Sequence, residues 1–133
     1  QDYPSLEQCI SIIHNAKGKA FLAHVFIYDW AIDKEEFIND LISNYKFDGI
    51  ECYYTRFAAW QTEYALEVCR QNGLYISGGT DTHGSNKPGI EIGLGYGNLQ
   101  IPDYLITDWN RQNKWFYKLF KKKQMMLTDG LYI

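Results

Sequence analysis

Apolar residues recur at helical spacing in three segments of the chain, and capping or turn residues bound each segment. Ser5 and Asp33, each followed three residues later by Gln or Glu, are typical of the N-caps of a first and a second helix. A third helix is predicted over residues 58–71, and Asn72-Gly73 supplies its stop. The spacing therefore predicts three amphipathic helices.

Short apolar runs of strand length alternate with these helices. Strands are predicted over residues 19–23, 50–54 and 74–79, each with a helix before it. This alternation is typical of a parallel α/β sheet or barrel, in which ligands gather at the C-terminal ends of the strands. We therefore expect an α/β fold with functional residues just after the strands.

The C-terminal part of the chain is less regular. Residues 84–97 are rich in glycine, which indicates an active-site loop, and a short strand is predicted over residues 90–94 inside it. Further on, one or two helices are predicted between residues 103 and 126. We therefore expect an α/β domain over residues 1–102 and a helical tail over residues 103–133, to which we assign no role.

Composition places the chain among globular proteins. With 133 residues, 46% of them apolar, it is large enough for one domain with a core. Its net charge of −3 argues against nucleic-acid binding by bulk positive charge. Cys9, Cys52 and Cys69 lie in apolar patterns without C-x-x-C spacing, so we expect reduced core residues rather than disulfides or a structural zinc site.

The sequence also bears on location. No apolar run of the roughly 18 residues that a transmembrane helix needs occurs in it. It shows no signal-peptide pattern either, so we expect a cytoplasmic protein with no membrane contact. The sequence begins at Gln1 rather than Met, which we take as the sign of a fragment, with part of the active site expected elsewhere.

Two of the predicted strands are followed by residues that can bind metals. His24 follows the first strand, and Asp81 and His83 follow the third within a glycine-flanked stretch. Residues two apart in an extended segment point the same way, so Asp81 and His83 can reach one ion. Two imidazoles and a carboxylate suit zinc, manganese or iron, and such an ion activates water and polarises a phosphoryl oxygen. The alternatives are a helix cap for Asp81 and a hydrogen-bonded structural role for His24.

Three further residues near these strand ends are candidates. Glu51 lies in a strand expected to be buried on both faces, so it needs a partner: a ligand histidine, a metal ion or an arginine. Arg56 follows this strand and could be that arginine or a phosphate contact. Lys87 could also contact a phosphate, and the alternative for it is an ordinary exposed loop lysine.

Four sequence blocks, taken in order, resemble the C-terminal half of the PHP (polymerase and histidinol phosphatase) domain: GKAFLAH, DGIECYY, GLYISGGTDTHGSNKP and LGYGN. The resemblance covers roughly residues 5–102. It is nearest to the stand-alone PHP phosphoesterases related to nucleoside 3′,5′-bisphosphate phosphatase and to the 5′-to-3′ RNA-trimming enzyme. Two positions depart from the family, because Val25 stands where proline is usual and Thr82 where phenylalanine is frequent.

The resemblance implies a distorted (β/α)7 barrel, of which this chain is the C-terminal portion. It also implies two or three divalent ions (manganese, iron or zinc) in the complete domain. By the resemblance, His24 matches a late metal-binding histidine, and Asp81 and His83 match the last Asp-x-His pair. The family's first ligands, an N-terminal His-x-His and a following Asp, His and Glu cluster, have no counterpart in this sequence.

These observations favour a metal-dependent phosphoesterase present as an incomplete half-domain. Its substrate would be a nucleotide, a small phosphorylated metabolite or an RNA 5′ end. The alternative is a catalytically inactive, structural or partner-binding PHP-like domain. A third hypothesis, an amidohydrolase on a (β/α)8 barrel, needs a carboxylated lysine or an early His-x-His, and neither is visible in the sequence. A half barrel leaves sheet edges unpaired, so we expect a complementing N-terminal half, a homo-oligomer or a domain swap.

Overall fold

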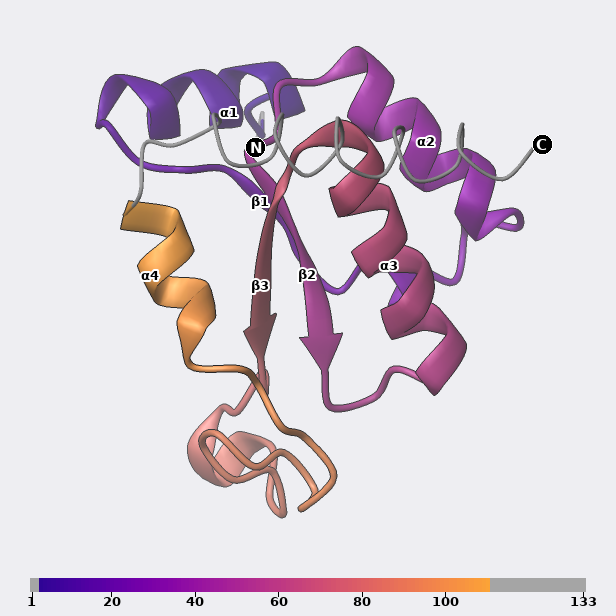
Figure 1. The fold of residues 1–133 in the computed structure, drawn as a ribbon, viewed down its shortest axis with the longest axis vertical. Helices are drawn as coiled ribbons and strands as arrows, with labels where there is room; N and C mark the ends of the chain where they lie inside the picture. The colour runs from indigo at the N-terminus through magenta and orange to yellow at the C-terminus, as the bar shows by residue number, and fades with distance from the viewer. Residues whose placement is uncertain (1–2, 111–133) are drawn as a thin grey trace, which may run out of the picture. The chain divides into compact units, whose positions relative to one another are not determined.

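A computed structural model describes residues 3–110 of the chain (Figure 1). The chain divides into two compact units, residues 1–103 and 104–133, and the helix α4 (Tyr104–Asn110) is the described part of the second. The first unit alternates helices and strands in the order α1 (Leu6–Asn15), β1 (Phe21–Leu22), the 3₁₀ turn η1 (Val25–Ile27), α2 (Lys34–Asn44), β2 (Gly49–Tyr54), α3 (Ala59–Asn72), β3 (Tyr75–Gly79) and the 3₁₀ turn η2 (Gly84–Asn86).

The three strands form an open parallel sheet in the order β1-β2-β3. The predicted alternation of helices with parallel strands is therefore confirmed. Parallel strands place their C-terminal ends at one edge of the sheet, so the loops after β1, β2 and β3 lie at the same edge (Figure 1). That edge is where the sequence predicts the functional residues.

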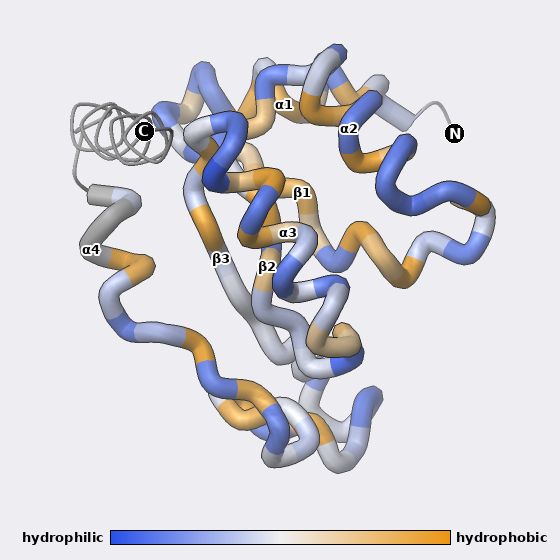
Figure 2. Tube along the Cα trace, turned by 45° about the vertical axis from the view of Figure 1, so that its right-hand side comes forward, coloured by the Kyte–Doolittle hydropathy of each residue, from blue (hydrophilic) through white to orange (hydrophobic). Residues whose placement is uncertain are grey.

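The hydrophobic core lies between the central strand and the helices beside it. Ile50 and Cys52 of β2 are fully buried, and they belong to one cluster with Ala65 and Cys69 of α3 and Ile38 of α2. Figure 2 shows the apolar positions along β1 and β2 and at intervals along the helices. Because the core covers one face of β2, the alternate side chains of that strand point to the opposite face and can contribute to a site at its C-terminal end.

Two of the three cysteines lie in the core as predicted, whereas Cys9 is only partly buried. Cys9, Cys52 and Cys69 are free thiols, and the Sγ atoms of Cys52 and Cys69 lie 3.5 Å apart in the core. The contact with Cys69, together with burial, raises the pKa of the Cys52 thiol. Both thiols therefore act as core residues.

Capping chemistry explains where the helices begin and end. The Ser5 hydroxyl accepts the backbone N–H of Gln8, and the Gln8 side chain accepts the N–H of Ser5, which completes the predicted capping box. The Asp33 carboxylate caps α2 by accepting the N–H of Glu36. Gly73 ends α3 at φ +65°, a left-handed conformation that glycine adopts readily.

The predicted strand over residues 90–94 is wrong. The chain forms turns there, with an isolated antiparallel bridge between Glu91 and Gly95. Gly93 and Gly95 have φ values of +80° and +63°, which are incompatible with an extended strand. Of the helices predicted between residues 103 and 126, α4 is present, and residues 111–126 lie outside the described part of the chain.

The glycine-rich loop is nevertheless anchored to the sheet. The Thr55 hydroxyl, just after β2, donates to Asn98 Oδ1 at 3.0 Å and accepts the N–H of Tyr96 at 3.1 Å. Asn98 Nδ2 donates back to the Thr55 carbonyl at 2.9 Å.

Within residues 3–110, no helix is long and apolar enough to cross a membrane.

Candidate functional site

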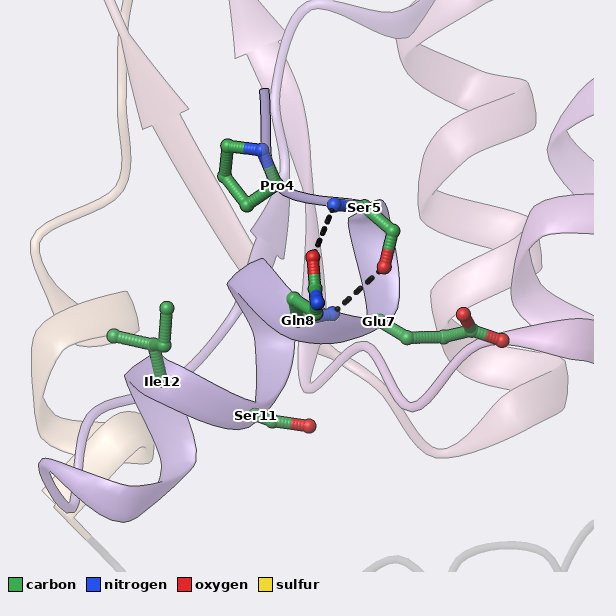
Figure 3. Close-up of a pocket in the computed structure, with 6 residues that line it drawn as sticks. All are labelled: Pro4, Ser5, Glu7, Gln8, Ser11 and Ile12. Carbon is green, nitrogen blue, oxygen red and sulfur yellow. Dashed lines mark hydrogen bonds between the residues drawn. The ribbon is translucent and has the colours of Figure 1, made fainter. Parts of the chain in front are cut away.

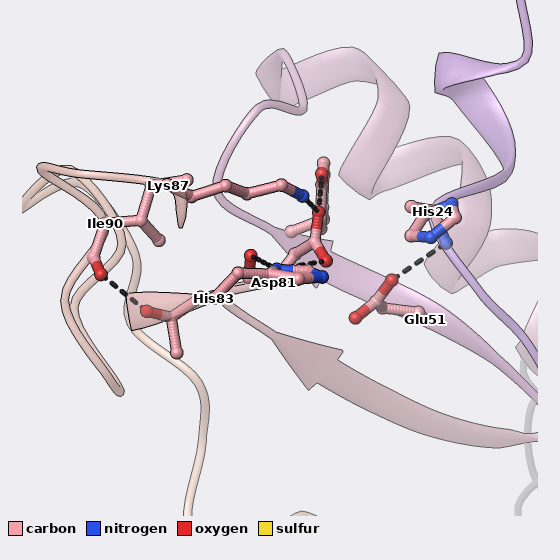
Figure 4. Close-up of polar contacts among 8 residues, drawn as sticks. His24, Glu51, Asp81, His83, Lys87 and Ile90 are labelled. Atoms are coloured by element: carbon pink, nitrogen blue, oxygen red, sulfur yellow. Dashed lines mark hydrogen bonds and ion pairs between the residues drawn. The ribbon is translucent and has the colours of Figure 1, made fainter. Parts of the chain in front are cut away.

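His24 lies two residues beyond β1, in a left-handed conformation with φ +33°. A non-glycine residue in this region costs about 1–3 kcal/mol, so the surrounding structure must hold it there. Its backbone N–H donates to Glu51 Oε2 at 2.8 Å (Figure 4). The carboxylate of the central strand thus fixes the backbone of the predicted ligand.

The His24 ring is enclosed by aromatic side chains. Its centroid lies 5.6 Å from that of Tyr28 and 5.7 Å from that of Tyr54. The ring nitrogen Nδ1 is buried and has no hydrogen-bond partner among the described residues. A buried polar atom without a partner is rare in folded proteins, and an ion is one group that satisfies it.

Asp81 follows β3 and is also left-handed, with φ +55°. Its Oδ2 accepts from the Tyr54 hydroxyl at 2.8 Å and from Lys87 Nζ at 2.5 Å. The hydrogen bond from the Lys87 ammonium lowers the pKa of the Asp81 carboxyl. Partial burial raises this pKa, and the hydrogen bond from the Tyr54 hydroxyl lowers it further, so the net shift is downward. Asp81 is therefore an anion at neutral pH.

His83 has one ring nitrogen engaged. Nδ1 lies 2.8 Å from the backbone carbonyl oxygen of Asp81. A carbonyl oxygen can only accept, so Nδ1 carries the proton and Nε2 has the lone pair that binds metals. His83 Nδ1 is also 3.5 Å from Asp81 Oδ1. The two residues meet through this turn, because the left-handed Asp81 breaks the extended geometry assumed from the sequence.

Glu51 is half-buried, and its partner is a backbone group. It binds the N–H of His24 rather than a histidine ring or an arginine. A Cβ at position 79 would lie 2.6 Å from Glu51 Oε1, so Gly79 leaves the space that this carboxylate occupies. Burial raises the pKa of Glu51. The hydrogen bond from the His24 N–H lowers this pKa, and the negative charge of Asp81 raises it, so the net shift is upward.

Arg56 and Lys87, the predicted phosphate contacts, differ in their surroundings. Arg56 is exposed in the turn after β2, and Lys87 is held by Asp81. Both phosphate roles remain predictions. At the two positions where the sequence departs from the family that it resembles, Val25 is fully buried and the Thr82 hydroxyl donates to the Ile90 carbonyl at 2.7 Å.

Tyr54 is the site residue that sequence reasoning missed. It contacts both His24 and Asp81, and burial followed by the bond to Asp81 raises its pKa to about 12. Tyr53 and Tyr54 stand side by side in the sequence. Strand periodicity alone does not tell which of them faces the site.

The donors match the chemistry of a divalent metal, but they do not form a complete cage. Within the described part of the chain, no group of three or more His, Cys, Asp and Glu side chains is placed to hold one ion. The candidates instead lie in two pairs, Glu51 with His24 and Asp81 with His83 (Figure 4). Imidazole with carboxylate suits zinc, manganese and iron.

The surface hollow in Figure 3 has no part in this arrangement. It is an open depression of about 660 Å³ at the start of α1. No candidate residue contributes to its lining, which consists of Pro4, Ser5, Glu7, Gln8, Ser11 and Ile12. Its polar groups include the closed capping box of α1, so it adds no chemistry to the strand ends.

Comparison with known proteins supports the fold. No family model and no curated protein matches the sequence. A solved structure from Bifidobacterium adolescentis, named "putative metal-dependent phosphoesterase", is similar with a TM-score of 0.63 and 23% identity. The similarity covers 81% of this chain and 36% of that one. The chain thus spans little more than a third of the length of that protein, and the likeness shows a shared α/β fold.

Proposed function

We propose that this chain is part of a metal-dependent phosphoesterase of the PHP type. The observation that carries the proposal concerns His24 Nδ1, which is buried and has no hydrogen-bond partner within residues 3–110. It lies at the same end of the sheet as Asp81 and His83. The similar solved structure bears a name of the same class.

Each candidate ligand has an assigned atom. His24 Nδ1 and His83 Nε2 would supply lone pairs, and the Asp81 carboxylate would supply negative charge. When bound, a divalent ion such as manganese, iron or zinc lowers the pKa of water and polarises a phosphoryl oxygen. Arg56 and Lys87 supply positive charge for the phosphate of a nucleotide, a small phosphorylated metabolite or an RNA 5′ end.

The remaining ligands are expected outside this sequence. Two paired donor sets are too few for a cluster of two or three ions, so we propose that an N-terminal half of the domain completes the site. Without that N-terminal half, a homo-oligomer or a domain swap would cover the unpaired edge strands of the sheet. We place the whole protein in the cytoplasm, and we expect the chain alone to be inactive.

A second candidate function rests on the Lys87–Asp81 ion pair. The ammonium already neutralises the carboxylate at 2.5 Å, as it would in a domain that had lost its metal. The chain would then be an inactive domain that binds a partner. The two candidates differ in whether the site takes up a divalent ion.

The test is metal uptake by this chain. The wild type, His83→Ala and His14→Gln are purified without chelator, and bound metal is measured by mass spectrometry. His14 is the matched control, because its ring binds Asp48 at 2.7 Å away from the site. We expect metal in the wild type and in His14→Gln and its loss in His83→Ala. Absence of metal from all three, also after addition of Mn²⁺, would favour the inactive domain.

A further inference from the structure

The central strand contains an irregularity that changes which side chains face the site. Glu51 of β2 pairs with Ser77 of β3, whereas Tyr53 pairs with Gly78, so Cys52 is an extra residue without a partner in the register. This is a β-bulge, and one extra residue reverses the alternation of side chains beyond it. Bulges are frequent beside active sites, where they re-aim a side chain.

The bulge brings Glu51 and Tyr54 to the same face. Their partners in β3, Ser77 and Gly79, are two residues apart and so share a face of the sheet. The 2.6 Å approach of Glu51 Oε1 to a Cβ position on Gly79 agrees with this placement. In a regular strand, residues 51 and 54 would face opposite sides. The bulge therefore gives one strand two contacts with the site.

The two contacts have matching roles. Glu51 accepts the N–H of the left-handed His24, and Tyr54 donates to the carboxylate of the left-handed Asp81. Glu51 and Tyr54 thus each bind one strained candidate ligand. Tyr54 is only 3% exposed and belongs to the sheet, whereas Lys87, the other donor to Asp81, has a side chain that is 40% exposed. Tyr54 is therefore the more buried of the two donors.

We propose that Tyr54 is a positioning residue for the metal ligand Asp81. Its hydroxyl occupies Oδ2 and so leaves Oδ1, the oxygen 3.5 Å from His83 Nδ1, as the one that turns toward the bound ion. Groups that orient ligands in this way typically change metal affinity 10- to 100-fold when removed. This inference rests on the proposed function, since it presupposes a metal at the site.

The experiment compares Mn²⁺ binding by calorimetry in the full 133-residue chain. The variants are Tyr54→Phe and, as control, Tyr64→Phe, which removes a hydroxyl bonded to Asn39 away from the site. A third variant places 4-methylphenylalanine at position 54. It fills the volume of tyrosine without a donor, so the comparison survives if the smaller phenylalanine fails to fold. Unfolding by urea with a chelator present reports stability without metal.

We expect both position-54 variants to bind Mn²⁺ about 10- to 100-fold more weakly than the wild type. We also expect them to unfold, without metal, at urea concentrations close to that of Tyr64→Phe. Wild-type affinity in the position-54 variants overturns the positioning role while leaving the proposed metal site intact. If the wild type itself binds no Mn²⁺, the proposed function fails, and the role of Tyr54 fails with it.

Discussion

At the proposed metal site, Lys87 and a divalent ion would compete for the negative charge of the Asp81 carboxylate. Lys87 Nζ lies 2.5 Å from Asp81 Oδ2. Replacing Lys87 with Met keeps the length and apolar stem of the side chain and removes the charge. We therefore predict that Lys87→Met binds Mn²⁺ more tightly than the wild type, because an ammonium group no longer neutralises the carboxylate that would bind the ion.

The geometry of the pair sets the magnitude. The side chain of Asp81 is 18% exposed and that of Lys87 is 40% exposed, so solvent screens the pair only in part. Its worth lies between that of a surface ion pair and that of a shielded charged hydrogen bond, about 1–2 kcal/mol. Since 1.4 kcal/mol corresponds to tenfold in affinity, the expected tightening is roughly 5- to 30-fold.

Calorimetric titration with Mn²⁺ measures this change, and Lys46→Met, an exposed lysine before β2, is the control. A second readout is stability without metal. The pKa of Asp81 lies below its ordinary 3.8, so the ion pair stabilises the fold above that pH and loses its effect as the pH falls through the folded-state pKa. The stability gap between wild type and Lys87→Met should therefore close in acid.

The outcome that refutes this reasoning is specific. If Lys87→Met binds Mn²⁺ as the wild type does, or more weakly, while the stability gap at neutral pH is present, then the ion and the ammonium do not compete. The charge of the Lys87 ammonium would then have no effect on the proposed metal site. If the stability gap is also absent, the ion pair itself does not form in solution.

Three other substitutions test separate contacts. Gly49→Ala places a Cβ 2.3 Å from the Phe21 ring, so we expect the free energy of unfolding, measured with urea, to fall by about 1–3 kcal/mol. A change within ~0.5 kcal/mol would contradict this packing. Burial holds the pKa of Glu51 above 4.5, so the free energy of unfolding of Glu51→Gln, relative to that of the wild type, should rise as the pH increases above that value. A difference that does not change with pH would show that the carboxylate is solvated. Thr55→Val loses the bond to Asn98, so we expect faster protease cleavage within residues 84–98, and an unchanged rate would mean that other contacts hold the loop.

The sequence predicted the regular elements of the fold well, because they depend on local signals. Ser5 and Asp33 cap the helices that their spacing predicts, and the apolar runs form three parallel strands. The failure at residues 90–94 has a physical cause. The run contains residues with strand propensity, but Gly93 and Gly95 adopt positive φ and turn the chain.

The positions of the candidate residues after the strands could be predicted from the sequence, whereas their geometry could not. His24, Asp81 and His83 do follow strand ends, as spacing predicts. Their left-handed or turn conformations depend on contacts from β2, which are distant in sequence. The Lys87–Asp81 pair was also hidden, because a loop lysine carries no local signal for its partner.

The bulge at Cys52 is the feature that a sequence pattern could least reveal, and it explains most about the site. Two adjacent tyrosines look interchangeable in the sequence, and the register shift at Cys52 places Tyr54 on the face where its hydroxyl donates to Asp81. Glu51, which precedes the shift, accepts the N–H of His24 on that same face. Strain at His24 and Asp81, the two left-handed candidate ligands, is offset by contacts from this one strand. Changes at Glu51 or Tyr54 should therefore alter the geometry of the candidate site before they unfold the core.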